Sequence, residues 1–314
     1  MSTTVGFVFT RPGFLSLLQD GGRRGVMHMG LATGGAMDRH AWAWANRLLG
    51  NSWGTPALEI TFGGIEFQSE LDTQIAITGA EVQCTVNGQP RPLWTTLAVH
   101  AGDTVTLSAP RTGIRSYLAV RGGFRVPPGL GGSCATFTRE GTGGLHRDGR
   151  PLQAGDRLPC PPSLEPVPVR KVPQPWQPDY RAPLELAVIP CAQVERFPAD
   201  TLARFFASEY TLTPQTDRMG ARLKGPALDV LGKTLISEGT SLGAIQVPAD
   251  GQPIVLLNDR QTIGGYPKLG AVTPRSLDAL AQRPPGTAIR FRATTLHEAQ
   301  LEERQFLRFF AEQV

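Results

Sequence analysis

The chain has 314 residues, a formal net charge of +4 and a hydrophobic share of 40%, which excludes a disordered protein and allows two domains of ordinary size. Its 36 glycines and 27 prolines, against 18% charged residues, favour short strands and tight turns over long surface helices. Acidic and basic residues are interspersed without a basic run of five, so the charge pattern is not that of a nucleic-acid-binding protein.

The sequence carries no signal for export, for a membrane or for a metal. Residues 1–5 lack the charged and apolar regions of a signal peptide, and no stretch approaches 18 consecutive apolar residues. The cysteines and histidines lie far apart, without metal-site spacing or a disulfide framework. They are Cys84, Cys134, Cys160 and Cys191, and His28, His40, His100, His146 and His297. We therefore expect a cytoplasmic protein with reduced thiols, no metal site and no contact with a membrane.

The first 160 residues are predicted to be mainly strands with one helix. Alternating and β-branched residues predict strands at 58–62, 74–78, 104–107 and 117–120. Asn87-Gly88 lies between two short extended runs and is a strong hairpin signal. Asp38 is placed to cap a helix that carries apolar residues up to Leu49 and ends at Gly50.

A proline-rich segment predicts the domain boundary. Between Pro159 and Pro183 proline recurs at intervals of five residues or fewer, and each X-Pro pair forces extended backbone. We interpret this segment as a semi-rigid connector. The predicted organisation is a first domain at 1–160, a connector at 161–183 and a second domain at 184–314.

The second domain is likewise predicted to contain short strands and a few helices. Strands are predicted at 184–189, 235–237, 244–247, 253–257 and 288–291. Thr273-Pro274 begins a short helix that ends near Gln282, with proline at the favoured first position. Thr295 and Glu298 form a capping-box pattern ahead of a C-terminal amphipathic helix. The fold class predicted from both halves is mainly β with a few short helices.

Three segments are rich in glycine, arginine, aspartate and glutamine, and poor in core residues. Glycine lets backbone approach a ligand closely, and arginine presents a planar fork that matches a carboxylate or a phosphate. Turns with surface ion pairs explain the first two segments equally well, whereas the third is too rich in polar groups for a plain hairpin. The segments are Leu18–Gly25 with Gly34–Arg39, then Thr216–Arg222, and Asn258–Lys268.

These segments and the motifs around them resemble the carboxyltransferase-domain subunit 2 family, which includes one of the subunits of 5-oxoprolinase, the Kip antagonist protein and part of urea carboxylase. The resemblance spans nearly the whole chain in family order. The motifs that carry it are LLQDGGRRG at 17–25, GGAMDRHAWAWANRLLGN at 34–51, ALEITFGG at 57–64, ITGAE at 77–81, YLAVRGGF at 117–124, TDRMGARLKGP at 216–226, GAIQVPADGQPIVLLNDRQTIGGYPKLG at 243–270 and LAQRPPGTAIRF at 280–291. The resemblance implies two tandem cyclophilin-like β-barrel domains.

The chain departs from the family pattern at three places. It has Gly132-Ser133-Cys134-Ala135-Thr136 where relatives read Gly-Ser-Arg-Ser-Thr, and Ile189–Gln193 where they often have Gly-Pro-Gln. It also has Ala221 where they have tyrosine. These departures concern the substrate more than the fold.

The resemblance implies membership in an ATP-dependent 5-oxoprolinase complex, which opens 5-oxoproline to glutamate, and a chain that is not active alone. The implied partners are a subunit 1 protein, similar to the B subunit of 5-oxoprolinase, together with the A subunit, and the implied substrate is a small amide or lactam. ATP is used by the complex, and no cofactor is bound covalently to this chain. Two alternatives stay open: the carboxyltransferase half of a biotin-dependent, urea-carboxylase-like enzyme with biotin on a partner, and a non-catalytic antagonist of a kinase inhibitor.

Lactam opening requires groups that hold the ligand carboxylate and stabilise negative charge on the amide oxygen. Arg218 or Arg260 is a candidate clamp for the carboxylate, with Asp259 orienting the guanidinium. Tyr266 and Lys268 are candidate donors to the oxyanion. The complete expected set is Asp259, Arg260, Tyr266 and Lys268 as catalytic residues, and Gln19, Asp20, Arg23, Arg218, Gln246, Gln261, Thr262, Gly264 and Gly265 as substrate-binding residues.

Overall fold

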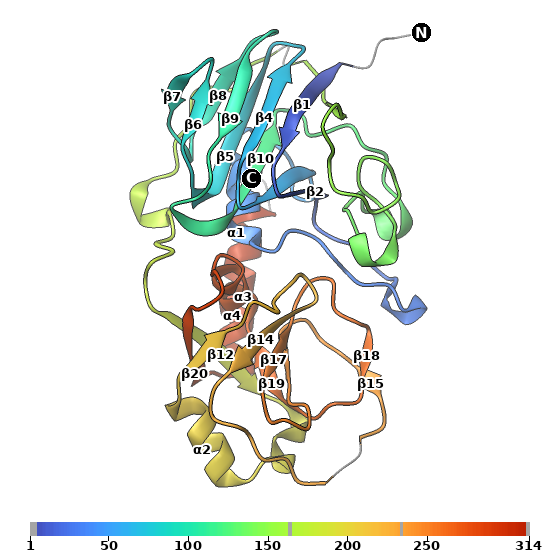
Figure 1. The fold of residues 1–314 in the computed structure, drawn as a ribbon, viewed down its shortest axis with the longest axis vertical. Coiled ribbons are helices and arrows are strands. Elements are labelled where there is room, and N and C mark those ends of the chain that lie inside the picture. The colour runs from blue at the N-terminus through green and yellow to red at the C-terminus, as the bar shows by residue number, and fades with distance from the viewer. Residues whose placement is uncertain (1–4, 163–164, 233–234, 312–314) are drawn as a thin grey trace. The chain divides into compact units, whose positions relative to one another are not determined.

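The computed structural model describes residues 5–162, 165–232 and 235–311, and it confirms a mainly β protein with few helices (Figure 1). The chain divides into two compact units. Among the described residues, the first unit contains those up to Arg24, then Gly34–Arg181, and finally Phe310 and Ala311. The second contains Gly25–Thr33 and Ala182–Phe309. A short segment near the N-terminus thus belongs to the second unit, which a division of the sequence into consecutive domains does not anticipate.

The first unit is built from two antiparallel sheets. One contains, in order, β11 (Arg157–Pro159), β1 (Gly6–Pro12), β4 (Ile65–Ser69), β9 (Thr104–Leu107), β6 (Cys84–Val86) and β7 (Gln89–Arg91). The other contains β2 (Leu15–Gln19), β3 (Ala57–Thr61), β10 (Thr112–Val120), β5 (Thr73–Glu81) and β8 (Thr96–Val99). Fully buried rings of Phe7, Phe9 and Phe67 contribute to the core of this unit. The ring centroids of Phe7 and Phe67 lie 4.7 Å apart.

Helix α1 (Arg39–Leu48) begins and ends where the local chemistry predicts. The side chain of Asp38 accepts a hydrogen bond of 2.9 Å from the backbone N–H of Ala41, and Gly50 adopts a positive φ just after the helix. The helix packs on β5 and β10, where the hydroxyl of Thr78 donates to the carbonyl of Ala41 at 2.7 Å. The predicted hairpin at Asn87-Gly88 is also confirmed, and both residues have positive φ.

The buried side chains of Glu59 and Tyr117 hold the backbone of the two residues that precede α1. The hydroxyl of Tyr117 donates to Glu59 at 2.7 Å and accepts from the backbone N–H of Asp38 at 2.8 Å. Glu59 also accepts from the backbone N–H of Met37 at 2.9 Å. Burial is the main cause that raises the pKa of Tyr117 well above its ordinary value, so the phenol stays protonated and keeps donating to Glu59.

The proline-rich connector lies against the first unit. Its backbone pairs with the start of β8 and the residues just before it: Val172 donates to the carbonyl of Trp94 at 2.9 Å, and Thr96 donates to that of Arg170 at 3.0 Å. The side chain of Val172 is fully buried. Residues 163–164 of the predicted connector lie outside the described residues. Within the described part, the connector therefore acts as an edge of the first unit.

The second unit contains a closed barrel of seven strands. Its order is β12 (Leu184–Pro190), β19 (Lys268–Val272), β16 (Ala244–Gln246), β17 (Ile254–Leu256), β14 (Gly220–Lys224), β13 (Tyr210–Leu212) and β20 (Ala288–Ala293). A separate ribbon pairs β15 (Glu238–Gly239) with β18 (Ile263–Gly264). The strand predicted at 235–237 is wrong. Ile236 is 92% exposed, so this run gains nothing from burial, and the pairing begins only at Glu238.

Three longer helices and several short ones complete the fold. Helix α3 (Pro274–Leu280) starts with proline as predicted, and α4 (Leu296–Phe310) starts at the expected capping box. Helix α2 (Ala199–Ala207) was not predicted. The 3₁₀ helices are Met27–Met29, Leu130–Gly132, Thr138–Glu140, Gln174–Trp176 and Ala192–Arg196. A helix long and apolar enough to cross a membrane is not found among the described residues.

Candidate functional site

Arg218 and Asp259 form a buried, two-point ion pair in the second unit. The Nε and Nη2 atoms of Arg218 lie 2.8 and 3.0 Å from the two carboxylate oxygens of Asp259. The backbone joins the same residues, because the N–H of Asp259 donates to the carbonyl of Arg218 at 2.8 Å. Asp217 folds its own turn by accepting from the N–H groups of Met219 and Gly220. Asp259 thus orients an arginine fork, and that arginine is Arg218.

Arg260 is buried among neutral acceptors. Its side chain donates to the carbonyls of Thr240 and Leu257 at 3.3 and 3.5 Å and to the hydroxyl of Thr33 at 3.2 Å. A fourth contact reaches the sulfur of Met27 at 3.9 Å. The residue is only 4% exposed, and this burial lowers the pKa of its guanidinium. A buried cation whose partners among the described residues are all neutral is poorly compensated and favours an anionic ligand.

A cluster of neutral polar groups lies beside Arg260. The side-chain amide of Gln261 donates to Gln246 at 3.3 Å, and the hydroxyl of Thr240 donates to the carbonyl of Gln261. The N–H of Thr240 donates to the carbonyl of Thr262 at 2.9 Å. Gly264 lies directly against Gln246, since a Cβ built on this glycine would be 2.6 Å from Nε2 of Gln246. Four of the expected substrate-binding residues are thereby brought together.

Lys268 is a buried lysine whose ammonium has a defined partner. Its Nζ lies 2.7 Å from Oε1 of Glu238, and its backbone N–H donates to the side chain of Gln193 at 2.8 Å. Gln193 also donates to Glu238. The hydrogen bond from Lys268 is the main cause that lowers the pKa of Glu238. Lys268 is therefore held by a carboxylate that stays ionised at neutral pH.

The remaining expected residues of this loop are less closely tied to the cluster. Tyr266 is 50% exposed, so its hydroxyl is not held in the interior. Gly265 lies near Ser237, whose hydroxyl would be 3.2 Å from a Cβ built on the glycine. The donor roles expected for Tyr266 and for the backbone of Gly264-Gly265 stay predictions.

The three expected residues of the first unit hold loops together. Asp20 accepts from the N–H of Gly22, from the hydroxyl of Ser133 and from the N–H of Cys134, all within 2.8 Å. Arg23 donates to Glu140 and lies 3.3 Å over the ring of Phe137. These bonds join the first glycine-rich segment to the segment that departs from the family pattern at Cys134.

Gln19 has one satisfied and one unsatisfied polar atom. Its Nε2 donates to the carbonyl of Thr136 at 3.1 Å, while its Oε1 has no hydrogen-bond partner among the residues that the structure describes. Gln19, Asp20 and Arg23 belong to the first unit and the other expected residues to the second, and the substrate-binding roles expected for these three stay predictions.

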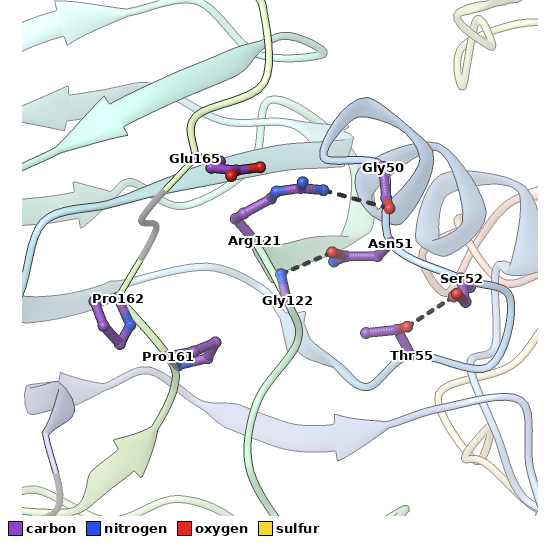
Figure 2. A pocket seen from close by; sticks show the side chains of 9 residues that line it. All are labelled: Gly50, Asn51, Ser52, Thr55, Arg121, Gly122, Pro161, Pro162 and Glu165. Atoms are coloured by element: carbon purple, nitrogen blue, oxygen red, sulfur yellow. Dashed lines mark hydrogen bonds between the residues drawn. The ribbon is translucent and has the colours of Figure 1, made fainter.

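Two of the open cavities in the described part of the first unit are lined by none of the expected site residues. One, of about 570 Å³, is lined by Gly50, Asn51, Ser52, Thr55, Arg121, Gly122, Pro161, Pro162 and Glu165 (Figure 2). In it, Arg121 donates to the carbonyls of Leu49 and Gly50 at the end of α1. The other, of about 580 Å³, lies along the connector beside Trp94 and Tyr180. Because Arg121 is occupied as a cap of α1, we place the candidate chemistry in the polar cluster of the second unit.

Sequence reasoning missed three residues that complete this cluster. Glu238 holds Lys268, Gln193 holds both of them, and Thr240 connects Arg260 with Gln261. Gln193 had been noticed only as part of a departure from the family pattern. A lone glutamate beside glycine carries no local signal of its partner 30 residues away. A group of three or more metal-ligating side chains is not found in the described part of the chain.

Comparisons with known proteins agree in both sequence and structure. The family model of the carboxyltransferase domain, subdomain A and B, matches residues 29–293. The chain is 40% identical over 307 residues to the C subunit of 5-oxoprolinase from Escherichia coli (strain K12), covering 96% of this chain and 95% of that protein. It is 35% identical over 291 residues to the C subunit of 5-oxoprolinase from Haemophilus influenzae, covering 90% and 89%.

A solved structure extends the likeness to a larger enzyme. The urea amidolyase of K. lactis superposes with a TM-score of 0.89 and 28% identity over 97% of this chain. This chain spans only 20% of the length of that protein. The family resemblance inferred from the motifs is confirmed.

Proposed function

The chain belongs to the carboxyltransferase domain A and B family, and from this membership we propose that it is the C subunit of an ATP-dependent 5-oxoprolinase complex. The observation that carries the proposal is the 40% identity to the C subunit of a 5-oxoprolinase across 95% of its length. A chain with that role has partners, and we propose that these correspond to the A and B subunits of such a complex. The chain then contributes part of a catalytic complex.

The reaction defines what the site must do. Hydrolysis of 5-oxoproline breaks the bond between the lactam carbonyl carbon and the ring nitrogen. The oxygen of water joins the carbon as part of a new carboxylate, and the nitrogen leaves as the amino group of glutamate. Negative charge develops on the lactam oxygen, and the substrate's own carboxylate must be held throughout.

The second unit offers groups suited to both demands. Arg260 is our candidate for the substrate carboxylate, because its present partners are neutral, whereas two donors of the Arg218 fork are bound to Asp259. Lys268 is our candidate donor to the lactam oxygen, with Glu238 orienting its ammonium. Arg218 and Asp259 then act as a rigid support of the loop that carries Arg260.

We assign ATP to a partner protein of the complex. ATP supplies the driving force for lactam opening when the complex binds it. A triphosphate is held by successive backbone N–H groups at the start of a helix, and the cluster described here presents amides and cations from strands and loops instead. No step of the chemistry on this chain is derived from ATP.

Reconstitution tests the proposal directly. This chain and its partners, the A and B subunits, are purified together and assayed for glutamate formation from 5-oxoproline with ATP. We expect activity only when all components are present. Glutamate formation that continues without this chain would refute the assignment.

Variants of the loop test the assigned roles. Arg260→Ala and Lys268→Ala are each expected to lower kcat/KM of the complex at least about 100-fold, the size of losing a charge-stabilising donor. Arg290→Ala is the matched control, because Arg290 is an exposed arginine of the same unit, paired with Glu209. If both loop variants keep full activity while assembling normally, the roles proposed for them are wrong.

A second candidate is the carboxyltransferase half of a biotin-dependent enzyme. The likeness to the urea amidolyase of K. lactis, and 32% identity to the urea amidolyase of Saccharomyces cerevisiae over 90% of this chain, favour it as a related function. Biotin would then be carried by a partner. Capture of this chain on streptavidin through a biotinylated partner, together with urea-dependent turnover and no glutamate from 5-oxoproline, would favour this candidate over the first.

A further inference from the structure

Gln246 carries a buried hydrogen-bond donor that is not satisfied. The side chain is at the end of β16 and is only 1% exposed. Its Oε1 accepts from Gln261 at 3.3 Å, but its Nε2 has no hydrogen-bond partner among the described residues. A buried donor left without a partner costs about 1–3 kcal/mol. The arrangement is therefore stabilised by any ligand that brings an acceptor to this nitrogen.

The ribbon of β15 and β18 covers this donor. A Cβ built on Gly264 would be 2.6 Å from Nε2 of Gln246, 3.2 Å from Cγ2 of Thr240 and 3.6 Å from Nε2 of Gln261. The two amide nitrogens thus both face the bare backbone of Gly264. On the other strand of the ribbon, a Cβ built on Gly239 would meet nothing within 4 Å. Of the two glycines in the ribbon, Gly264 is tightly packed and lies against Gln246, whereas Gly239 faces open space.

The chemistry around this donor is that of a site for a neutral carbonyl group. Gln246 and Gln261 contribute amides, Thr240 contributes the methyl group Cγ2, and none of these three side chains carries a charge. An amide N–H donates well to the oxygen of a lactam or a ureido group, which is neutral before reaction. The cation of Arg260 is one residue away from Gln261 and bonds to the carbonyl of Thr240, so it supplies a charged neighbour to the neutral site.

We propose that the side-chain amide of Gln246 binds the ring carbonyl of a lactam or ureido substrate, and that the β15–β18 ribbon must move off Gln246 to admit it. This inference rests on the proposed function and adds the atom that recognises the amide end of the substrate. Gln261 is a positioning residue, because it holds Oε1 of Gln246 and thereby turns Nε2 toward the ligand.

The first test separates the amide from the carboxylate of the substrate. The complex is assayed with 5-oxoproline, and with cyclopentanecarboxylate as a competitive inhibitor that keeps the carboxylate but lacks the amide. For Gln246→Met we expect the KM for 5-oxoproline to rise about tenfold or more, as for the loss of one buried hydrogen bond. The inhibition constant of cyclopentanecarboxylate should change less than about twofold. Equal changes for both compounds, or no change for either, would overturn the inference.

The second test uses the ribbon and does not alter Gln246. Gly264→Ala places a methyl group against Nε2 of Gln246, and Gly239→Ala places one on the open side of the same ribbon. We expect Gly264→Ala to raise the KM for 5-oxoproline at least about fivefold, and Gly239→Ala to leave it within about twofold. Similar kinetics for the two variants would show that contact between the ribbon and Gln246 does not matter.

A binding measurement distinguishes a failure of this inference from a failure of the proposed function. If the assembled complex forms no glutamate from 5-oxoproline, the proposed function fails, and Gln246 is tested with 2-imidazolidinone, a ureido compound without a carboxylate. Calorimetry of the complex should show binding by wild type and a loss of at least about tenfold in Gln246→Met. Equal binding by both, or binding by neither, would overturn the role of Gln246.

Discussion

Asp259 joins the candidate loop to Arg218 through both its side chain and its backbone. It binds Arg218 at two points, and both side chains are buried. Removing one partner of a buried ion pair takes a bound countercharge from the other, which typically destabilises a protein by about 3–5 kcal/mol. We therefore expect Asp259→Asn to lower the free energy of unfolding by roughly 3 kcal/mol, measured by urea denaturation of the whole chain.

An exposed pair in the same unit is the control for this prediction. Arg290 and Glu209 form an ion pair whose side chains are both more than half exposed. Pairs of that kind contribute about 0–1 kcal/mol, so Glu209→Gln should unfold almost as the wild type does. If Asp259→Asn is as mild as Glu209→Gln, the buried pair is not a structural support of the loop.

Single residues also show what the sequence could not decide. The composition of Asn258–Lys268 correctly marked a polar loop, but it left open whether Asp259 orients Arg218 or its neighbour Arg260. The answer depends on a contact between residues 41 positions apart, and nothing local specifies it. The partner of Lys268 was missed for the same reason, since Glu238 lies on a strand defined only by its pairing with β18.

Among the elements, those with strong local chemistry were predicted best. The cap of α1, the Asn87-Gly88 turn and the proline that starts α3 each act within a few residues, and each is found where expected. Several short strands that pair with distant partners were missed, among them β13, β14 and β19. Strand β19 begins with Lys268, a charged residue that is only 7% exposed. The sequence does not indicate this burial, because it results from the pairing of distant strands in the barrel.

The capping box of α4 leads to a prediction about pH. Glu298 accepts from the N–H of Thr295 at 2.9 Å, and this bond is the main cause that lowers the pKa of Glu298 below its ordinary 4.5. A carboxylate whose pKa is lower in the folded state contributes stability above its unfolded pKa. That contribution is lost as the pH falls through the folded value.

Hydrogen exchange in the first turn of α4 measures this effect. At about pH 6 we expect these amides to exchange faster in Glu298→Ala than in wild type, because the cap is absent. The difference should shrink as the pH falls below 4.5, once intrinsic rates are corrected for. Glu298→Gln keeps an acceptor and should show a protection that does not change with pH in this range. A wild-type advantage that persists unchanged at low pH would contradict the assignment.

At the scale of the whole molecule, the order of residues along the chain and the division into units do not coincide. Residues 25–33 precede most of the first unit in sequence but belong to the second. Within that unit Arg260 contacts Thr33 and Met27. The domains at 1–160 and 184–314 stay a prediction, which rests on the local restriction of backbone by the prolines between them. The place of residues 25–33 in the second unit could not be predicted, since it depends on contacts with a side chain that is 227 residues from Thr33 and 233 residues from Met27.

Because residues 25–33 belong to the second unit, we predict that the two parts of the chain stay together when the chain is cut near residue 181. A specific protease site placed after Arg181 would yield fragments 1–181 and 182–314, and the first fragment carries residues 25–33, which pack in the second unit. We expect the fragments to elute together in size-exclusion chromatography after cleavage. Thr33→Val removes the hydroxyl that Arg260 binds at 3.2 Å and should weaken the association about tenfold, as expected for a hydrogen bond to a charged group. Arg290→Ala, a change at an exposed site of the second unit, should leave the association unchanged. Wild-type fragments that separate on the column would show that residues 25–33 do not hold the second unit to the rest of the chain.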